Sequence, residues 1–374
     1  MTAVDHHTPI PFLDLRQPHA ALEDELVEAF RSALRSAQFV GGPEVAAFER
    51  EFAAFVGTAA AVAVNSGTDA LRFAYQALGV RPGDEVITVP NTFIATTEAL
   101  TQAGATVRFV DVRDDTLTID PDAAAQAAAS RTVGIVPVHL YGQMAEMDPL
   151  IALAARHGLW IVEDAAQAHG ASHNGRRAGT LGTLGAFSFY PGKNLGACGE
   201  GGAVTGPEGP QLETVRRIRE HGQSSKYVHE TEGYNGRLHA IQAAFLRIKL
   251  PHLDRWNAGR RRAAAWYREA LDDIAEIRLP VEAPGSVPVY HLFVIRAQRR
   301  DALQEHLASR GIGTGLHYPV PLHLQRAYQH LGLGRGAFPV AERAAAELLS
   351  LPMFPELTAG QIGVVADAIR AFYR

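Results

Sequence analysis

The chain of 374 residues has little cysteine and no long apolar run, and each shortage excludes a class of protein. Its single cysteine, Cys198, cannot form an internal disulfide framework, which fits a reducing compartment. No apolar stretch approaches the roughly 18 to 20 residues that a membrane span needs. The segment from Met1 to Pro11 has no basic run followed by an apolar one, so we expect no signal peptide and a cytoplasmic protein.

Charge is also modest. The formal net charge of −5 gives no reason to expect a surface that binds nucleic acid or anionic membranes. With 47% hydrophobic and 20% charged residues, the composition is that of an ordinary globular protein. The length favours two domains: residues 1–250, comprising an N-terminal segment and a large α/β domain, and residues 251–374, a small C-terminal α+β domain.

The pattern of apolar residues predicts an α/β fold. Segments of strand length alternate with helical segments of about ten residues, which is typical of a mainly parallel sheet with helices on both faces. Such sheets bind ligands beyond the carboxyl ends of their strands. The predicted strands are residues 59–64, 85–90, 106–112, 132–139 and 159–163.

Local signals give further expectations. Asn91 and Thr92 are interpreted as the cap of a helix that follows the second strand. Residues 222–236 are predicted to be a polar loop. A long helix is predicted over residues 253–271, and its four clustered arginines are interpreted as a solvated helix face: Arg255, Arg260, Arg261 and Arg262.

Several polar or aromatic residues directly follow predicted strands. Gly67 and Thr68 stand at a strand-to-helix turn, where free backbone N–H groups make an anion site. A plain helix cap fits that stretch equally well. Phe93 follows the second strand and Asp164 the fifth. Because the carboxyl ends of parallel strands share one edge, we expect these residues to lie close together.

Lysine is scarce, with only Lys193, Lys226 and Lys249 in the chain. Lys193 follows a short aromatic strand and lies 193 − 164 = 29 residues after Asp164, enough chain to leave the sheet and return. A lysine and an aspartate at one sheet edge suit pyridoxal 5′-phosphate (PLP). This cofactor needs an amine to hold its aldehyde as a Schiff base and a carboxylate to keep its ring nitrogen protonated.

Other chemistries fail on the sequence. Phe187 stands where a Walker A loop would need its first glycine, and Asn194 where it would need serine or threonine. The dinucleotide glycine pattern and the Gly-x-Ser-x-Gly elbow are missing. His169 and His173 have i, i+4 spacing, but Gly170 stands where a zinc protease needs glutamate. We therefore expect no metal site.

The residues that follow the predicted strands can be assigned to the phosphate and the ring of PLP. Gly67 and Thr68 would hold the PLP phosphate, with the Ser188 hydroxyl as a further donor. Phe93 would stack on the face of the ring. Taken singly, each residue has a simpler interpretation, because Phe93 can be a core residue and Ser188 a strand hydroxyl.

The acid and the amine would carry the chemistry. Asp164 would hold the pyridinium proton, so that the ring can act as an electron sink. Lys193 would bind the cofactor and then act as the base that moves the proton from the substrate's Cα. Asp164 can also be a simple cap of the following helix. Together at one sheet edge, these residues favour PLP chemistry.

Motifs across nearly the whole chain, from residue 11 to residue 355, resemble the DegT/DnrJ/EryC1/StrS family of sugar aminotransferases. The resemblance is carried by the following segments: Asn65-Ser-Gly-Thr-Asp-Ala-Leu71, Asn91-Thr-Phe-Ile-Ala-Thr96, His139-Leu-Tyr-Gly-Gln143, Glu163-Asp-Ala-Ala-Gln-Ala-His-Gly170, Ser188-Phe-Tyr-Pro-Gly-Lys-Asn-Leu-Gly196, Gly233-Tyr-Asn-Gly-Arg-Leu238 and His317-Tyr-Pro-Val-Pro-Leu-His323.

The resemblance implies the fold type I architecture of PLP-dependent aminotransferases and a homodimer with shared active sites. It implies that Gln167 bonds the pyridoxal 3-hydroxyl and that Asn235 reaches the cofactor phosphate of the other subunit. It also implies a nucleotide-linked keto sugar as substrate and L-glutamate as the amino donor.

The segment around Lys193 is most similar to members that aminate C3 of a dTDP-3-keto-6-deoxyhexose. In those members the residues that match Tyr190, Lys226 and His317 contact the nucleotide sugar. Without the resemblance, Lys226 is interpreted equally well as a solvated loop lysine. One departure from the family pattern is His239, where aspartate is common.

The sequence therefore predicts a PLP-dependent transaminase in amino-sugar biosynthesis. Amination at C4, or of a cyclitol ketone such as an inosose, stays open. Sugar dehydratases of this kind have histidine in place of the lysine, so Lys193 argues against that reaction. A non-catalytic regulatory or binding protein of the same fold is a further alternative, but no basic face supports DNA binding.

Overall fold

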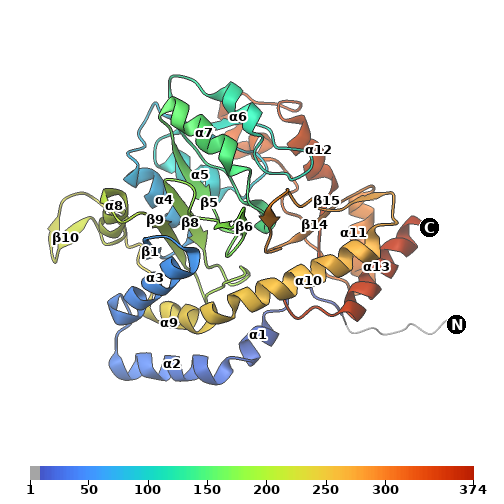
Figure 1. Cartoon of the computed structure of the whole chain (residues 1–374), viewed down its shortest axis with the longest axis horizontal. Coiled ribbons are helices and arrows are strands. Elements are labelled where there is room, and N and C mark those ends of the chain that lie inside the picture. The colour runs from blue at the N-terminus through green and yellow to red at the C-terminus, as the bar shows by residue number, and fades with distance from the viewer. Residues whose placement is uncertain (1–8) are drawn as a thin grey trace.

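The computed structural model describes residues 9–374, built around a central seven-stranded sheet (Figure 1). The expectation about a signal peptide falls mainly on residues 1–8, which lie outside this range. The strand order is β1-β9-β8-β5-β4-β2-β3. The strand bounds are Ala60–Val64 (β1), Glu85–Thr88 (β2), Thr106–Phe109 (β3), Thr132–Ile135 (β4), Trp160–Asp164 (β5), Leu184–Ser188 (β8) and Gly202–Gly206 (β9).

The sheet is mainly parallel, as predicted. β2 pairs in parallel with β3 and β4, β4 with β5, and β5 with β8. β9 runs antiparallel to both β8 and β1, so β1 points the same way as β8. Six carboxyl ends therefore meet at one edge of the sheet, which confirms the α/β architecture that the apolar pattern indicated.

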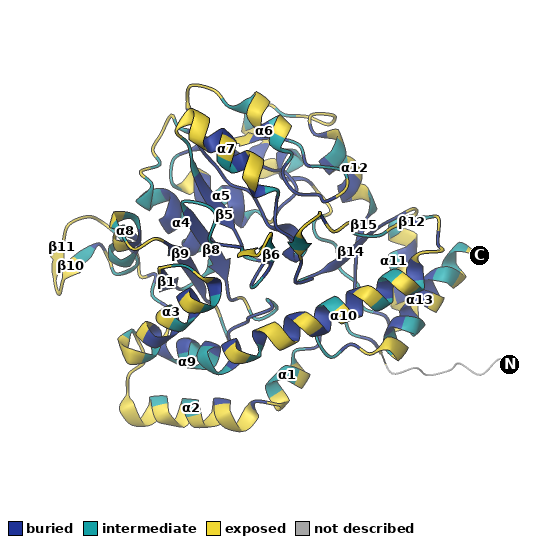
Figure 2. Ribbon diagram, viewed as in Figure 1, coloured by how far each residue is buried: buried dark blue, intermediate teal, exposed yellow. Residues whose placement is uncertain are grey.

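Helices surround the sheet and cover its apolar strands, which are buried along their whole length in most cases (Figure 2). These helices are Gly42–Val56 (α3), Gly67–Ala77 (α4), Ala95–Gln102 (α5), Pro121–Ala127 (α6), Met147–His157 (α7), Pro210–Arg219 (α8) and Ala240–Lys249 (α9). Arg16–Ala20 (α1) and Glu23–Ser36 (α2) lie outside this layer, and α2 packs on α9 (Figure 1). In the described range of the chain, no helix is both long and apolar enough to cross a bilayer.

A second, smaller sheet follows in the chain, with the order β12-β14-β15. One face of this sheet forms a hydrophobic core separate from that of the large sheet, whereas Val294 and Leu348 on its other face pack in the core of the large sheet. We propose the domain division after residue 250 on this ground. Ile10 also packs in the second core, so the N-terminal segment joins both parts. The elements are Leu253–Leu271 (α10), Ile277–Arg278 (β12), Phe293–Ala297 (β14), Arg300–Ser309 (α11), Pro339–Glu347 (α12), Leu348–Leu351 (β15) and Ala359–Tyr373 (α13).

Two local expectations are wrong. Asn91 and Thr92 do not cap α5, which begins at Ala95 without a side-chain cap. Thr92 instead shares a hydrogen bond of 2.8 Å with Thr96. The polar segment 222–236 is not all loop, because Gln223–Ser225 (β10) and Val228–His229 (β11) form a hairpin that projects from the body of the molecule in Figure 1.

The arginines of α10 are not all solvated. Arg260 is only 3% exposed, which corrects the interpretation of the cluster as one solvated face, whereas Arg255 and Arg262 are exposed. Arg260 can be buried because its guanidinium has acceptors inside the protein. Arg260 Nη1 donates to the carbonyl oxygens of Tyr290, His291 and Met353 at 3.1 to 3.2 Å, and these acceptors compensate for the lost hydration.

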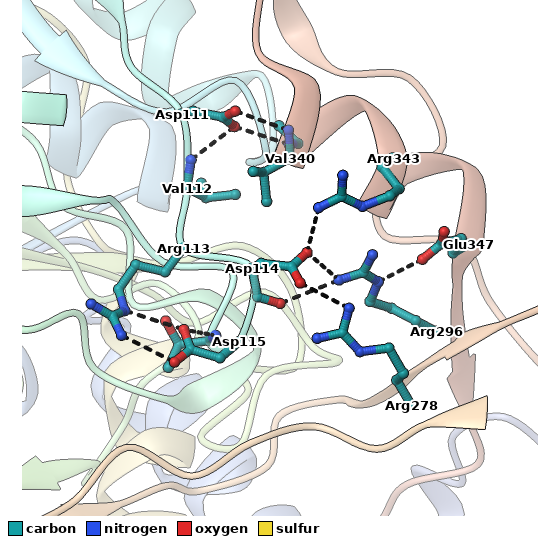
Figure 3. Close-up of polar contacts among 12 residues, drawn as sticks. Asp111, Val112, Arg113, Asp114, Asp115, Arg278, Arg296, Val340, Arg343 and Glu347 are labelled. Carbon is teal, nitrogen blue, oxygen red and sulfur yellow. Dashed lines mark hydrogen bonds and ion pairs between the residues drawn. The ribbon is translucent and has the colours of Figure 1, made fainter. Parts of the chain in front are cut away.

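A polar network holds α12 and the small sheet against the loop after β3 (Figure 3). Asp111 accepts from the backbone N–H groups of Val340 and Ala341, both at 2.9 Å, at the start of α12. The Asp114 carboxylate receives three guanidinium groups at 2.6 to 2.8 Å, from Arg278, Arg296 and Arg343. The small sheet is therefore fixed relative to the large one by charge-assisted hydrogen bonds.

Candidate active site

A cavity of about 550 Å³ lies beyond the carboxyl ends of β1, β5 and β8. Its volume is within the range of small-molecule sites. Nine of the eleven residues that the sequence singled out for the site line it: Gly67, Thr68, Phe93, Asp164, Gln167, Ser188, Tyr190, Lys193 and His317. The topology thus brings together residues spread over 317 − 67 = 250 positions of sequence.

An anion site lies at the start of α4. Ser66 is the N-cap, and its Oγ accepts from the N–H of Asp69 at 3.1 Å. The N–H groups of Gly67 and Thr68 remain available toward the cavity, where Ser188 adds a hydroxyl. A Cβ on Gly67 would lie only 2.5 Å from the Cβ of Ser188, so this approach requires glycine. The helix cap is therefore present, and the same turn keeps the geometry that the anion-site interpretation needs.

The Asp164 carboxylate is buried at the end of β5. Its Oδ2 accepts from Thr96 Oγ1 at 2.7 Å, and its Oδ1 accepts from the N–H of Ala166 at 3.2 Å. Burial raises the pKa of this carboxyl, whereas these two hydrogen bonds and the charge of Lys193 act in the opposite direction. Two donors therefore fix the carboxylate in orientation and leave it facing the cavity.

Lys193 lies in the turn after β8, and its N–H donates to the carbonyl oxygen of Tyr190 at 2.8 Å. Burial lowers the pKa of the Lys193 amine to about 8, although the Asp164 carboxylate works against this shift. An amine with such a pKa is neutral in a large fraction of molecules near pH 8. It can therefore act as a nucleophile and as a base.

A second polar group faces the cavity from the segment after β5. The Gln167 side chain accepts from the N–H of Tyr141 at 2.7 Å and donates to the hydroxyl of Tyr318 at 3.3 Å. The amide orientation is therefore set by the backbone of one segment and a phenol of another. The N–H₂ group of Gln167 points to the Tyr318 hydroxyl oxygen, and an N–H₂ donor is also what a ring hydroxyl oxygen of a ligand would need.

Aromatic rings form the rest of the wall. Phe93 lies against the ring of Tyr318 with centroids 5.8 Å apart. The ring of His317 stacks on Phe12 at 5.5 Å, and His317 Nδ1 is 2.8 Å from Ser350 Oγ. Phe12 lies in the N-terminal segment and was not singled out by sequence reasoning. Its place in the wall depends on a return of the chain that no local pattern reveals.

Two of the predicted site residues lie outside the cavity of their own chain. Lys226 is on the exposed hairpin β10–β11, with its Nζ 5.2 Å from the centroid of the Tyr227 ring. Asn235 Oδ1 accepts from Arg237 Nη2 at 2.5 Å. The cavity of a single chain therefore includes neither of these two residues.

The third lysine has a structural position. Lys249 is only 4% exposed, and its Nζ donates to the carbonyl oxygen of Gly196 at 2.9 Å. The same Nζ lies 2.8 Å from His19 Nε2 and 3.5 Å from Cys198 Sγ. Lys249 therefore anchors the glycine-rich loop that follows Lys193.

Sequence reasoning missed the support behind Asp164. The neighbouring Glu163 is fully buried, with its oxygens accepting from the N–H groups of Gly179, Leu181 and Gly182 at 2.6 to 2.8 Å. His139 Nε2 is 2.8 Å from the same carboxylate. The sequence did contain a signal for this support, because Glu163 is a charged residue inside an apolar strand. A buried carboxylate needs several hydrogen-bond donors around it.

The tautomer of His139 follows from its contacts. Its Nδ1 accepts from the N–H of Ala145 at 3.2 Å, so Nε2 carries the hydrogen that is donated to Glu163. Burial by itself raises the pKa of Glu163, but His139 and the backbone donors more than offset this, and the pKa lies below its usual value. The network is therefore a neutral imidazole and a carboxylate.

Replacement of Glu163 by glutamine should lower the free energy of unfolding at pH 7 by about 2 to 4 kcal/mol, because a glutamine N–H₂ would face backbone donors. Since the folded pKa of Glu163 is depressed, its stabilisation is present above about pH 4.3 and is lost as pH falls further. The difference between Glu163→Gln and wild type, measured by urea unfolding, should therefore shrink below that pH. Glu305→Gln, on an exposed position of α11, is the control and should change little.

The residues of the cavity fit PLP. The start of α4, with a glycine that a Cβ would force against Ser188, suits a phosphate. The oriented carboxylate of Asp164 suits a ring nitrogen, and the amine of Lys193 suits an aldehyde. Among residues 9–374, no group of three or more histidine, cysteine or acidic side chains could hold a metal ion.

Comparisons with known proteins agree with this geometry. A model of the DegT/DnrJ/EryC1/StrS aminotransferase family matches residues 20–370. The chain is 49% identical to the dTDP-3-amino-3,4,6-trideoxy-alpha-D-glucose transaminase of Streptomyces venezuelae, over 96% of this chain and 95% of the relative. It is also 49% identical to the erythromycin biosynthesis sensory transduction protein EryC1 of Saccharopolyspora erythraea, over 93% and 95%.

A solved structure matches the fold closely. The crystal structure of S. venezuelae DesV in complex with a ketimine intermediate superimposes with a TM-score of 0.96 and 48% sequence identity. The match covers 98% of this chain and 99% of that one. The architecture of the chain is therefore that of a fold type I aminotransferase.

Proposed function

The chain belongs to the DegT/DnrJ/EryC1/StrS aminotransferase family, and on this premise we propose that it transfers an amino group from L-glutamate to C3 of a dTDP-linked 3-keto-6-deoxyhexose. It is a PLP-dependent aminotransferase. The observation that carries the proposal is that the amine of Lys193 and the carboxylate of Asp164 face one cavity.

PLP supplies an aldehyde that binds amines and a ring that withdraws electrons from the bond to be broken. Asp164, oriented by Thr96 and the N–H of Ala166, holds the proton on the ring nitrogen. Lys193 Nζ takes the proton from the Cα of the amino donor and returns a proton to the sugar carbon in the second half of the reaction. Gly67 and Thr68 hold the phosphate through backbone N–H groups.

The substrate assignment rests on the similarity to a relative named as a dTDP-3-amino-3,4,6-trideoxy-glucose transaminase. Tyr190 and His317 line the cavity and are the residues that the resemblance connects with the nucleotide sugar. A C4 aminotransferase is the second candidate. A solved structure of 3-amino-5-hydroxybenzoic acid (AHBA) synthase has the same fold at 32% identity and a TM-score of 0.89, so the fold alone does not select the substrate.

The site also supports a homodimer. Asn235 and Lys226 lie away from the cavity of their own chain, and β10–β11 projects from the body of the molecule (Figure 1). Exposed apolar side chains on α2, namely Val27, Phe30 and Leu34, provide a surface for a second copy. We propose that each active site takes Asn235 and Lys226 from the partner chain.

Replacement of Lys193 by alanine should abolish turnover, by about 10²- to 10⁴-fold or more, because both the cofactor amine and the base are lost. The purified variant should also lack the visible absorbance that PLP shows when it is bound to a lysine. Lys226→Ala should keep that absorbance and raise KM for the nucleotide sugar. No turnover in the wild-type protein, together with no visible absorbance even after PLP is added, would favour a regulatory protein of the same fold.

The substrate can be tested with a panel of dTDP-, GDP- and UDP-linked 3-keto and 4-keto sugars, with L-glutamate as donor and product mass as the readout. We expect the dTDP-3-keto-6-deoxyhexose to give the highest kcat/KM. A higher value with a 4-keto sugar would assign the enzyme to C4. No product from any member, together with turnover of an inosose, would replace the sugar by a cyclitol.

Shared active sites can be tested with two different affinity tags on Lys193→Ala and Asn235→Ala chains. Each variant alone should be nearly inactive. The isolated heterodimer should regain about half of wild-type activity, because one of its two sites then has both native residues. Activity no higher than that of the separate variants would show that Asn235 serves its own chain.

A further inference from the structure

The turn that precedes β14 has a strained backbone beside the active-site cavity. Tyr290 has a φ of 44°, in the left-handed region that non-glycine residues rarely adopt. Gly142 approaches this turn so closely that a Cβ there would lie 2.9 Å from the backbone nitrogen of His291. A conformation of this kind persists only where its surroundings fix it.

Two buried side chains fix the turn. Arg260 donates to the carbonyl oxygens of Tyr290 and His291, as described above. Asn194 Nδ2 donates to the carbonyl oxygen of Val289 at 2.9 Å. Since Asn194 directly follows Lys193, the strained turn is tied to the residue next to the reactive lysine.

This fixed turn brings His291 to the wall of the cavity that Lys193 also lines. Within residues 9–374, neither ring nitrogen of His291 has a hydrogen-bond partner, and Nδ1 is buried. A buried polar atom without a partner is costly in a folded protein. Strain at Tyr290 and an unpartnered imidazole in one turn indicate that His291 is placed for the reaction rather than for stability.

The amine of Lys193 also has no hydrogen-bond partner in the described part of the chain. A lysine ammonium has three hydrogens to donate and can accept none, so it needs acceptors. Asp164 already accepts from Thr96 and the N–H of Ala166. His317, the other histidine of the cavity, has its Nδ1 2.8 Å from Ser350 Oγ.

We propose that His291 is a further positioning residue of the active site, whose imidazole accepts a hydrogen bond from Lys193 Nζ when that amine is free and protonated. The hydrogen bond would hold the nitrogen inside the cavity between the two halves of the reaction. The inference uses the proposed function only for the role of Lys193 as the base.

The charge state of His291 agrees with this role. Burial lowers the pKa of His291 well below its usual value, and the nearby positive groups Lys193 and Arg260 lower it further, as do His317 and His169. The imidazole is therefore neutral at neutral pH and keeps one nitrogen as an acceptor.

The scarcity of lysine gives a direct test. Reductive methylation with ¹³C-formaldehyde labels only three lysines and the N-terminus, and the Lys193 signal is the one that Lys193→Ala lacks. In the cofactor-free protein, Lys193 should titrate with a pKa of about 8. Replacement of His291 by leucine should lower this pKa by about one, because a protonated amine loses an acceptor.

Two further variants separate positioning from stability. His291→Gln keeps an acceptor and should restore most of the wild-type pKa of Lys193. His169→Leu is the matched control, because His169 is buried with both ring nitrogens unpartnered but does not line the cavity. It should change thermal stability and leave the pKa of Lys193 in place.

In the PLP-loaded enzyme, His291→Leu should lower kcat about tenfold with little change in KM for the sugar. An unchanged pKa of Lys193 in His291→Leu, or an equal change in His169→Leu, would overturn the proposal. If His291→Leu does not fold, His291→Asn can replace it, because the shorter amide of asparagine cannot reach as far as that of glutamine. Equal pKa values of Lys193 in wild type, His291→Gln and His291→Asn would then overturn the proposal. A shifted pKa in a protein without aminotransferase activity would refute the proposed function and leave this inference intact.

Discussion

The burial of two adjacent carboxylates at the end of β5 is the constraint on which the site depends. Successive residues of a strand point to opposite faces, so Asp164 faces the cavity and Glu163 faces away from it. Glu163 compensates for its desolvation with donors from the 179–182 turn and with His139. Asp164 is thereby attached to a rigid strand end, and its direction is fixed before any ligand binds.

The close approach of two backbone segments fixes the other parts of the site. The first turn of α4 lies against Ser188 so tightly that only glycine fits at position 67. The same contact sets the distance between the start of α4, which follows β1, and Lys193, which lies a few residues after the end of β8. A cofactor that bridges both would therefore be held by two rigid elements rather than by flexible loops.

Much of this arrangement could be predicted from the sequence because it depends on strand ends. The alternation of strands and helices located Gly67, Phe93 and Asp164 at one edge, and the structure places them around one cavity. Arg260 was misinterpreted because periodicity does not distinguish a solvated arginine from one that binds three carbonyl oxygens. Similarly, Asn91 and Thr92 have the composition of a helix cap, but Thr92 instead shares a hydrogen bond with Thr96, which donates to Asp164.

Other site features depend on distant parts of the chain, which local patterns do not report. His291 reaches the cavity only because a strained turn and a buried arginine direct it there. Phe12 reaches it because the N-terminal segment returns to the small sheet. Lys226 and Asn235 lie outside the cavity of their own chain, and a single sequence contains no signal for their roles beyond its resemblance to known enzymes.

The return of the N-terminal segment has a consequence for biosynthesis of the protein. Ile10 pairs with Ile312, and the N–H of Met353 donates to the carbonyl oxygen of Phe12 at 3.1 Å. Ile10 and Phe12 therefore meet their partners only after nearly the whole chain has left the ribosome, and that wall of the cavity cannot close earlier. A nascent chain can complete its large sheet early, but it gains a finished catalytic pocket only at the end of translation.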